Sequence, residues 1–338
     1  MPVIKEGSVR VDLVGGTLDL EPIHLILKNV VTINVATSLK AKVKLERNKE
    51  NYIEIISEDY GTSQKFDKSE FNSENLYHSQ HFGPMTFVCQ ILDYFNVTSG
   101  ITITLSSGAP TGSGLGGSSA MGVTLVSALC ELTEQKKSKL EMITKVKAIE
   151  SRILNQGIAG YQDYYPALFG GILGLKAAVG EVVVDQLYSE DLKRFLEEHV
   201  TLVYSGQSRH SGINNWEVYK AFFDGKKETR QGMKEIADIS YATYEAIKKK
   251  NYNDIIELIG KEGETRKKLF PGIESKEIQS FFSSLKKHHP KVGIKMCGAG
   301  GGGCFILVHP STDAKDIQAA VVKAGMKVLA FKVDKPLT

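Results

Sequence analysis

The spacing of hydrophobic and polar positions predicts strands and helices in both halves of the chain. Residues 101–105, which read ITITL, alternate apolar and polar side chains with the period of a strand that has one buried face. Apolar positions at helical spacing fill residues 121–132, and longer helical patterns cover 216–250 and 254–268. Alternation returns in 292–308. Strands and helices mixed along the whole chain predict an α+β fold.

Other segments complete this pattern. Residues 85–95 are expected to form a buried helix, and residues 201–204 and 326–333 further strands. The polar stretch 48–79 is expected to carry exposed strand, turn and loop, and the glycine-rich apolar stretch 170–175 to cross between domains. A chain of 338 residues is long enough for two domains or for one large one.

The composition is that of a globular protein and argues against several classes of function. The net charge of +3 is too small to predict binding to nucleic acid or to a membrane surface. Apolar runs are too short to span a bilayer, and the first residues lack the apolar core of a secretory signal, so we expect a cytoplasmic protein. Four cysteines without C-x-x-C spacing predict free thiols in a reducing compartment rather than a zinc site.

Residues 110–120, which read PTGSGLGGSSA, are the most informative segment. They lie between the strand expected at 101–105 and the helix expected at 121–132. Glycines let backbone N–H groups turn inward, and the start of a helix adds partial positive charge. The loop is therefore predicted to bind an anion, most often phosphate. Ser118 and Ser119 either cap the helix or reach a metal ion bound to the phosphates.

This loop has three other interpretations. Residues 112–117 satisfy the dinucleotide pattern G-x-G-x-x-G, but the polar end of a helix, not a strand with an acid, follows at the required distance. Gly117 is followed by Ser118 and not by the lysine of a P-loop. A helix start whose glycines serve only a turn stays open, although so many glycines with two serines exceed what a turn needs.

Two further segments, taken with this loop, indicate a family. Residues 10–19 read RVDLVGGTLD, and residues 295–304 read KMCGAGGGGC. The three segments resemble, in order, the signature motifs of the GHMP kinases, the superfamily of galactokinase, homoserine kinase, mevalonate kinase and phosphomevalonate kinase. The resemblance covers nearly the whole chain. It implies a two-domain GHMP kinase fold of mixed sheets and helices, with an N-terminal ATP-binding domain at 1–170, a C-terminal domain at 171–338 and the active site between them.

Within that superfamily the chain resembles D-glycero-D-manno-heptose 7-phosphate kinases. The first motif resembles R-x-x-x-x-G-G-G-T-D-L, residues 160–171 resemble G-x-Q-D-x-Y followed by F-G-G, and residues 264–270 resemble a late helix with two adjacent lysines. Two departures bear on the choice of sugar. The first motif reads GGTLDL where the family has GGGTDL, and the phosphate loop reads GLGGSSA where GLGSSSA is commoner.

The resemblance implies a sugar kinase that depends on ATP and Mg²⁺. The implied reaction transfers the γ-phosphate to the anomeric hydroxyl of D-glycero-D-manno-heptose 7-phosphate, and the implied partner is this small sugar phosphate or a sugar. A homodimer is compatible with it. Kinases for fucose, galactose or a uronic acid stay open, as does a non-catalytic relative that binds nucleotide or sugar. An NAD-dependent oxidoreductase rests only on G-x-G-x-x-G and lacks the surrounding pattern.

Asp163 and Arg10 are the predicted catalytic residues. Asp163 lies among aromatic residues and glycines, where a buried carboxylate is costly without a purpose. A carboxylate can orient a sugar hydroxyl and accept its proton, so Asp163 is the predicted base, although it could instead cap the following helix. In the resemblance, Arg10 takes the position of a basic residue near the transferred phosphate. The alternative is a surface ion pair with Asp12 or Glu6.

The resemblance assigns the triphosphate and the metal ion to the glycine-rich loop and one acid. In the family a loop serine and an acid on a following helix hold the metal, which matches Ser119 and makes Glu150 the best candidate for the acid. Glu150 could instead pair with Lys147 or Arg152 on its own helix. The predicted nucleotide-binding residues are Pro110, Gly112, Gly114, Leu115, Gly116, Gly117, Ser118 and Ser119.

Sugar-binding residues are expected on several segments. Asp19 matches the acid that hydrogen-bonds sugar hydroxyls, and is otherwise a turn residue. Arg209, in a serine-rich turn, suits a second phosphate. The loop 298–303 joins two strands and predicts a backbone concavity against the ligand rather than a plain hairpin turn. Lys267 and Lys268 are otherwise typical of a solvated helix end. The remaining predicted substrate-binding residues are Gly15, Gly16, Gly300, Gly301, Lys267 and Lys268.

Overall fold

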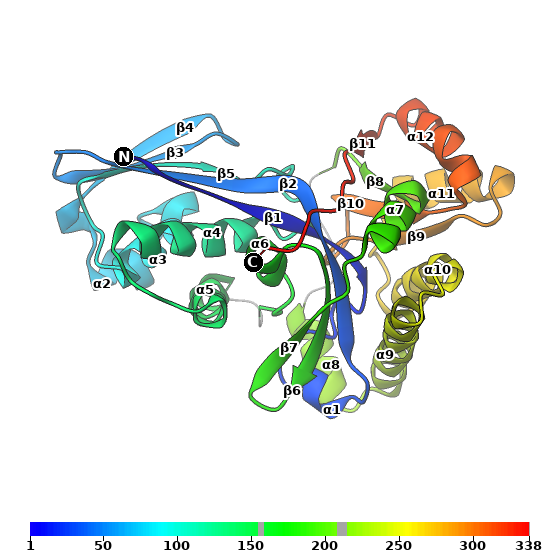
Figure 1. Cartoon of the computed structure of the whole chain (residues 1–338). Helices are drawn as coiled ribbons and strands as arrows, with labels where there is room; N and C mark the ends of the chain where they lie inside the picture. Colours follow the sequence, from blue (N-terminus) through cyan, green and yellow to red (C-terminus); the bar gives the residue numbers. More distant parts are fainter. Residues whose placement is uncertain (155–158, 208–214, 338) are drawn as a thin grey trace.

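The computed structural model describes residues 1–154, 159–207 and 215–337, and it confirms the α+β prediction (Figure 1). A mixed sheet of seven strands has the order β4-β3-β5-β2-β6-β7, with β1 paired to β2. An antiparallel sheet of four strands has the order β11-β8-β10-β9. The strands are β1 (Val3–Val14), β2 (Val31–Arg47), β3 (Tyr52–Ser57), β4 (Thr62–Asp67), β5 (Ile101–Ser106), β6 (Ile172–Ala178), β7 (Glu181–Gln186), β8 (Val200–Tyr204), β9 (Gly293–Met296), β10 (Cys304–Val308) and β11 (Lys327–Leu329).

Helices cover both sheets. Figure 1 shows α3, α4 and α5 below the sheet that contains β1, β2 and β5, and α11 and α12 beside the smaller sheet. Helix α4 packs on β1 and β2, and α10 packs on β9 and α9. The α-helices are α1 (Ile23–Ile26), α2 (Ser73–Tyr77), α3 (Thr86–Tyr94), α4 (Gly117–Leu132), α5 (Lys139–Leu154), α6 (Tyr165–Phe169), α7 (Glu190–His199), α8 (Asn215–Phe223), α9 (Lys227–Lys248), α10 (Asn253–Leu269), α11 (Lys276–His288) and α12 (Ala314–Lys323).

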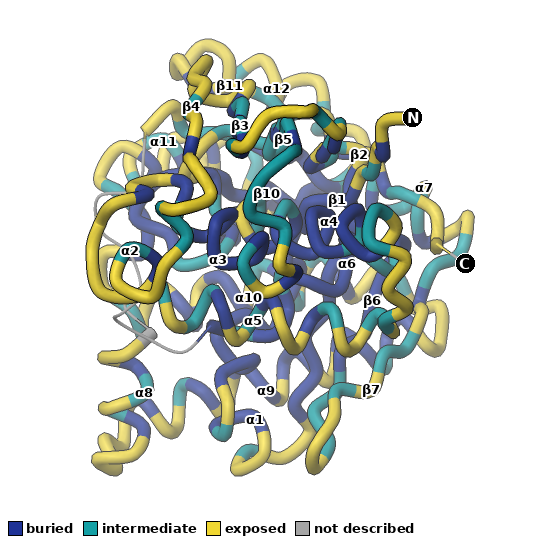
Figure 2. Tube along the Cα trace, turned by 90° about the vertical axis from the view of Figure 1, so that its left-hand side faces the viewer, coloured by how far each residue is buried: buried dark blue, intermediate teal, exposed yellow. Residues whose placement is uncertain are grey.

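The long strand β2 explains how one sheet serves two parts of the molecule. Its first seven residues are all buried, and the first five of them pair with β6. Its last six residues alternate between buried and more exposed positions, and they pair with β5, whose own alternation matches the pattern predicted for 101–105. Figure 2 shows the buried residues concentrated in β1, β2 and α4 at the centre of the molecule. The pocket described below opens beside this rigid centre.

Chain beyond residue 170 returns to the larger sheet. Strands β6 and β7 extend that sheet past the expected domain boundary, and the C-terminal segment pairs with it through bridges from Val333 to Thr37 and from Pro336 to Gly170. Lys40 on β2 forms an ion pair with Asp334. Segments on both sides of the expected boundary at residues 170 and 171 therefore belong to the larger sheet. The boundary between the two domains stays a prediction.

Most expected elements are confirmed, and two differ. The helical pattern of 216–250 forms two helices, α8 and α9, because Gly225 turns the chain with a φ of 78° between them. The alternation of 326–333 forms a strand only at β11, and the rest is extended chain with an isolated bridge. The pattern of 292–308 forms β9 and β10 with the glycine-rich loop between them, as predicted.

The state of the cysteines agrees with the prediction from the sequence. All four cysteines are buried and unpaired, as the spacing predicted. None of the helices in the described residues has both the length and the apolar character needed to cross a membrane.

Candidate active site

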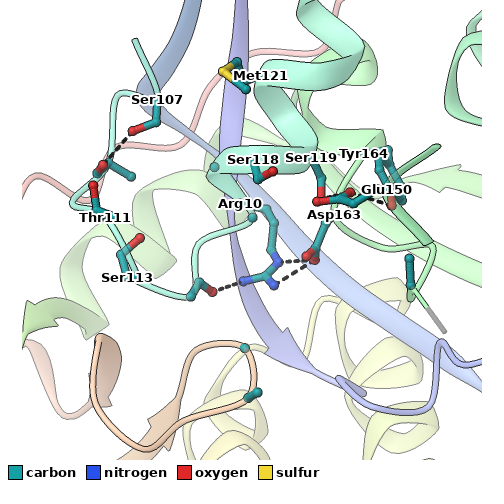
Figure 3. Close-up of a pocket in the computed structure, with 18 of the residues that line it drawn as sticks. Arg10, Ser107, Thr111, Ser113, Ser118, Ser119, Met121, Glu150, Asp163 and Tyr164 are labelled. Atoms are coloured by element: carbon teal, nitrogen blue, oxygen red, sulfur yellow. Dashed lines mark hydrogen bonds and ion pairs between the residues drawn. The ribbon is translucent and has the colours of Figure 1, made fainter. Parts of the chain in front are cut away.

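A pocket of about 500 Å³ opens where all three sequence motifs meet. The end of β1, the loop before α4, the segment 159–164 and the loop after β9 all contribute to its wall. Figure 3 shows how Arg10, Asp163, Ser119, Glu150 and Tyr164 gather beside the start of α4. The pocket wall also includes the apolar side chains of Met85, Phe87, Val88, Leu105 and Met121.

The glycine-rich loop presents a helix start to this pocket. Gly112, Gly114 and Gly116 have φ values of 70°, 75° and 70°, which are accessible to glycine at little cost. Helix α4 begins after Gly116, and no side chain caps it, so the proposed capping role of Ser118 or Ser119 is wrong. The first residues of α4 line the pocket with unsatisfied N–H groups and the positive end of the helix dipole. This arrangement suits a phosphate.

The two glycine-rich loops pack backbone against backbone. A Cβ at Gly114 would lie 2.6 Å from the carbonyl oxygen of Cys297, and a Cβ at Gly303 would lie 2.7 Å from that of Gly112. The backbone N–H of Cys304 donates to the carbonyl of Ser113 at 2.7 Å. Close approach, and not merely a hairpin turn, is therefore what requires so many small residues in the loop 298–303.

An ion pair joins the buried Arg10 to Asp163, whose side chain is 29% exposed. Arg10 Nε donates to Asp163 Oδ1 at 2.8 Å, Nη2 lies 2.7 Å from the same oxygen, and Nη1 donates to the carbonyl of Gly114. The Arg10 side chain is 3% exposed, so the alternative of a surface ion pair is wrong, and Glu6 pairs with Lys42 instead. Burial opposes the charged guanidinium, but the carboxylates of Asp163 and Asp12 outweigh it and raise the pKa of Arg10.

Ser119 and Glu150 lie in contact at the start of α4. Ser119 Oγ donates to Glu150 Oε2 at 2.7 Å, and the Tyr164 hydroxyl donates to the same oxygen at 2.8 Å. Burial raises the pKa of Glu150, although both hydroxyl donors oppose this shift. Glu150 does not pair with Lys147, whose ammonium binds Glu21. The alternative in which Glu150 is a solvated helix residue is therefore wrong.

The donor set at this point fits Mg²⁺. A serine hydroxyl and a carboxylate are hard oxygen ligands, and Mg²⁺ in phosphate sites takes one or two protein groups and completes its shell with phosphate and water. Ser119 and Glu150 would hold the ion beside the helix start. When bound, it would neutralise charge on the phosphate oxygens. The residues contribute by keeping two oxygens together in a largely buried position.

Asp19 also lines the pocket, and it is buried and ionisable. Its carboxylate accepts from the backbone N–H and the side-chain Nε2 of Gln162, each at 3.2 Å. Burial raises the pKa of Asp19 to about 6, with a smaller contribution from the nearby charge of Asp163, while the Gln162 backbone opposes the shift. Asp19 is therefore a carboxylate that changes protonation state close to neutral pH.

Behind Arg10 lies a charge cluster that the sequence analysis did not identify. It consists of Asp12, Glu262, Arg266 and Lys295, whose side chains are at most 2% exposed. Lys295 Nζ donates to Asp12 Oδ2 at 2.8 Å, and Arg266 Nη1 donates to the same oxygen at 3.5 Å. Burial would raise the pKa of Asp12, but Lys295 and Arg266 outweigh it and lower that pKa. Burial raises the pKa of Glu262.

Three signals in the sequence point to this cluster. Asp12 follows Arg10 at a spacing of two, which places both on one face of a strand. Glu262 and Arg266 are four apart on a helix, and Lys295 interrupts an apolar strand. Each signal is weak alone, because only the fold brings β1, α10 and β9 together.

Not every predicted residue lies on the pocket wall. Gly16 and Asp19 line the pocket, as do Gly298 and Ala299 of the third motif. Lys267 and Lys268 lie on the last turn of α10 away from the wall, and Lys267 pairs with Glu274 at 2.6 Å. Arg209 lies outside the described residues. The predicted residues that are described but absent from the wall are Gly15, Leu115, Gly300, Gly301, Lys267 and Lys268.

Two family models match the chain. The model for the GHMP kinases N terminal domain matches residues 85–171, and the model for the GHMP kinases C terminal matches residues 243–327. The first match includes the loop before α4 together with Glu150 and Asp163, and the second includes Arg266, Lys295 and the loop after β9.

Curated relatives and a solved structure are similar over much of the chain. An L-fucokinase/L-fucose-1-P guanylyltransferase of Bacteroides fragilis is 25% identical over 93% of this chain, and the chain spans about a third (35%) of its length. A D-glycero-alpha-D-manno-heptose 7-phosphate kinase of Campylobacter jejuni is 25% identical over 65% of this chain and 64% of its own. The crystal structure of a D-glycero-D-manno-heptose 1-phosphate kinase from Bacteroides thetaiotaomicron has a TM-score of 0.76 at 20% identity, covering 99% of this chain and 97% of that one. This last likeness shows the fold.

The raised pKa of Asp19 makes a prediction about stability. The native state holds this proton more tightly than the unfolded chain, so ionising Asp19 costs stability as pH rises from about 4 to about 6. A shift of about two pKa units corresponds to roughly 3 kcal/mol. As the pH rises from 4 to 7, the free energy of unfolding of the wild type should therefore fall relative to that of Asp19→Asn by up to this amount. Urea denaturation at a series of pH values measures the difference, and a difference that is constant with pH would contradict the assignment.

Proposed function

Because this chain belongs to the GHMP kinase superfamily, we propose that it is a kinase that transfers the γ-phosphate of ATP to a hydroxyl group of a sugar. The observation that carries the proposal is the ion pair of the buried Arg10 with Asp163, which lines the same pocket as the glycine-rich helix start and Asp19. Phosphoryl transfer needs a phosphate cradle, a metal site and a positioned nucleophile. The pocket offers residues suited to each of these.

In the proposed reaction, Asp163 orients the sugar hydroxyl and accepts its proton as the bond to phosphorus forms. Arg10 holds the Asp163 carboxylate through one hydrogen bond and a second ion-pair contact to the same oxygen, which leaves the other oxygen available for the sugar hydroxyl. The guanidinium also offers positive charge for the equatorial oxygens of the transferred group. Asp19 accepts a hydrogen bond from a second sugar hydroxyl and so fixes the acceptor.

The acceptor that we propose is D-glycero-D-manno-heptose 7-phosphate, phosphorylated at its anomeric hydroxyl. The support is the motif G-x-Q-D-x-Y around Asp163, with the Campylobacter jejuni relative that is named a heptose 7-phosphate kinase. A distal phosphate would then need a cation beyond the described pocket wall, for which Arg209 is the sequence-based candidate.

An unphosphorylated sugar such as L-fucose is a second candidate, and one observation favours it. The only cations among the described residues of the pocket wall are Arg10 and Arg266, and both are already paired with carboxylates. Lys267 and Lys268, two further candidates for binding a second phosphate, are not on the wall. The Bacteroides fragilis relative, whose name includes L-fucokinase, matches over 93% of this chain.

A panel of acceptors tests the function and separates the two candidates. The wild-type protein is incubated with ATP, Mg²⁺ and each of heptose 7-phosphate, L-fucose, galactose and a uronic acid, and the products are identified by phosphorus NMR. A new sugar 1-phosphate resonance with heptose 7-phosphate alone supports the first candidate, and one with L-fucose alone supports the second. Formation of no sugar phosphate from any acceptor would contradict the proposed function.

Ser119→Ala should weaken the use of Mg²⁺ more than it weakens binding of the sugar. Ser119 shares an oxygen contact with Glu150 at the predicted metal position, and lesser changes around metal ligands already cost about 10- to 100-fold in affinity. The Mg²⁺ concentration for half-maximal rate should rise by at least about tenfold, with an unchanged KM for the sugar. Ser127→Ala, on the same helix but away from the pocket, is the matched control. An unchanged Mg²⁺ dependence would leave Ser119 with a structural role only.

A further inference from the structure

Thr17 adopts a backbone conformation that a β-branched residue rarely takes. Its φ is 73°, and within the described residues it is the only β-branched residue with positive φ. Such a conformation costs about 1–3 kcal/mol and persists only where surrounding contacts enforce it. Thr17 also stands where the related motif GGGTDL has its third glycine, since this chain reads GGTLDL. The position that glycine would occupy without strain therefore carries a hydroxyl.

The buried side chain of Arg266 binds the Thr17 hydroxyl. Arg266 Nη2 donates to Thr17 Oγ1 at 3.1 Å and to the carbonyl of Gly298 at 3.0 Å. One guanidinium nitrogen thus joins the loop after β1 to the loop after β9, although Thr17 and Gly298 are 281 positions apart in the sequence. The donor itself is fixed, because Arg266 is 1% exposed and also pairs with Asp12.

The loop held in this way is the one that carries Asp19. Thr17 and Asp19 both line the pocket, and Thr17 lies in the short turn that is closed by the bond from Leu18 N to the carbonyl of Gly15 at 3.3 Å. A change in the backbone at Thr17 therefore moves the carboxylate of Asp19 relative to Asp163. The phosphate loop and the Ser119–Glu150 contact lie on other segments and do not depend on it.

We propose that Arg266 is a positioning residue for the acceptor. By binding Thr17 and Gly298 at once, it fixes the loop that presents Asp19. The position of this loop then determines which acceptor is bound and how tightly. This inference rests on the proposed sugar kinase function. Arg266 acts through Thr17 and need not touch the acceptor. The guanidinium is suited to this task because its planar fork can satisfy several acceptors in fixed directions, which a lysine ammonium does less well.

Hydrophobic packing is the competing explanation. Leu18 is fully buried in the core near α9 and β9, and it could hold the loop without any help from Arg266. The two explanations differ in what they expect of the Thr17 hydroxyl. If Leu18 alone holds the loop, removing that hydroxyl while keeping the shape of the side chain has no effect on the acceptor.

Thr17→Val tests this point without disturbing the buried charges. It keeps the β-branched shape and the strained backbone, but it removes the oxygen that accepts from Arg266. The KM for the best acceptor of the panel should rise about tenfold, the lower end for a charge-assisted hydrogen bond, with kcat and the KM for ATP within about twofold of wild type. Thr17→Ser keeps the hydroxyl and should restore the wild-type KM. Thr243→Val is the matched control, because it removes another buried hydroxyl bond, on α9 away from the pocket.

Arg266→Lys provides the second arm. It keeps a positive charge opposite Asp12 but loses the fork, so it should also raise the acceptor KM, and adding Thr17→Val to it should cause no further rise. Independent losses that multiply in the double variant would overturn the proposal, as would a wild-type acceptor KM for Thr17→Val. A kcat that falls as much as KM rises would instead indicate a catalytic role and would also overturn it.

Hydrogen exchange separates a failure of this inference from a failure of the proposed function. Peptides that cover residues 15–20 and 298–303 should exchange faster in Thr17→Val than in Thr243→Val, and this needs no acceptor. Faster exchange in a protein that phosphorylates no sugar would refute the function while upholding the contact. Unchanged exchange in an active sugar kinase would refute the positioning role of Arg266 alone.

Discussion

The ion pair between the buried Arg10 and Asp163 is the interaction on which the rest of the site depends. A guanidinium at 3% exposure is costly unless its N–H groups are satisfied, and here a carboxylate and the carbonyl of Gly114 satisfy them. The backbone N–H of Arg10 also donates to the carbonyl of Leu115 at 3.0 Å. Arg10, on the buried part of β1, therefore contacts both the phosphate loop and the predicted base. Their relative position follows from the packing of β1.

The glycines and the buried charges extend this constraint to the C-terminal half. The loop after β9 can touch the phosphate loop only because neither carries side chains at the point of contact. Asp12, two residues beyond Arg10, binds Lys295 and Arg266, and Arg266 continues to Thr17 and Gly298. The pocket is thus built from segments far apart in the sequence, and each of them is held by a hydrogen bond or by backbone contact.

The sequence was informative where chemistry and local geometry coincide. The phosphate loop, the start of α4 and the loop between β9 and β10 follow from residue types at fixed spacing, whereas the partnership of Ser119 with Glu150 was implied by the family resemblance. The charge cluster around Asp12 could not be predicted in this way, because β1, α10 and β9 meet only in the fold. The strain at Thr17 and the pairing of Lys267 with Glu274 are likewise tertiary outcomes. The extension of the larger sheet by β6 and β7 was hidden for the same reason.

The central claim is that Arg10 and Asp163 act as one unit in phosphoryl transfer, and a double-mutant cycle on kcat tests it most directly. Asp163→Asn, Arg10→Met and the double variant are compared with the wild type under saturating ATP and acceptor, with ATP binding and folding checked separately. The account predicts that Asp163→Asn lowers kcat by roughly 100- to 10,000-fold and that adding Arg10→Met lowers it little further. Losses that multiply in the double variant, or an Asp163→Asn variant with more than about a tenth of wild-type kcat, would contradict the account.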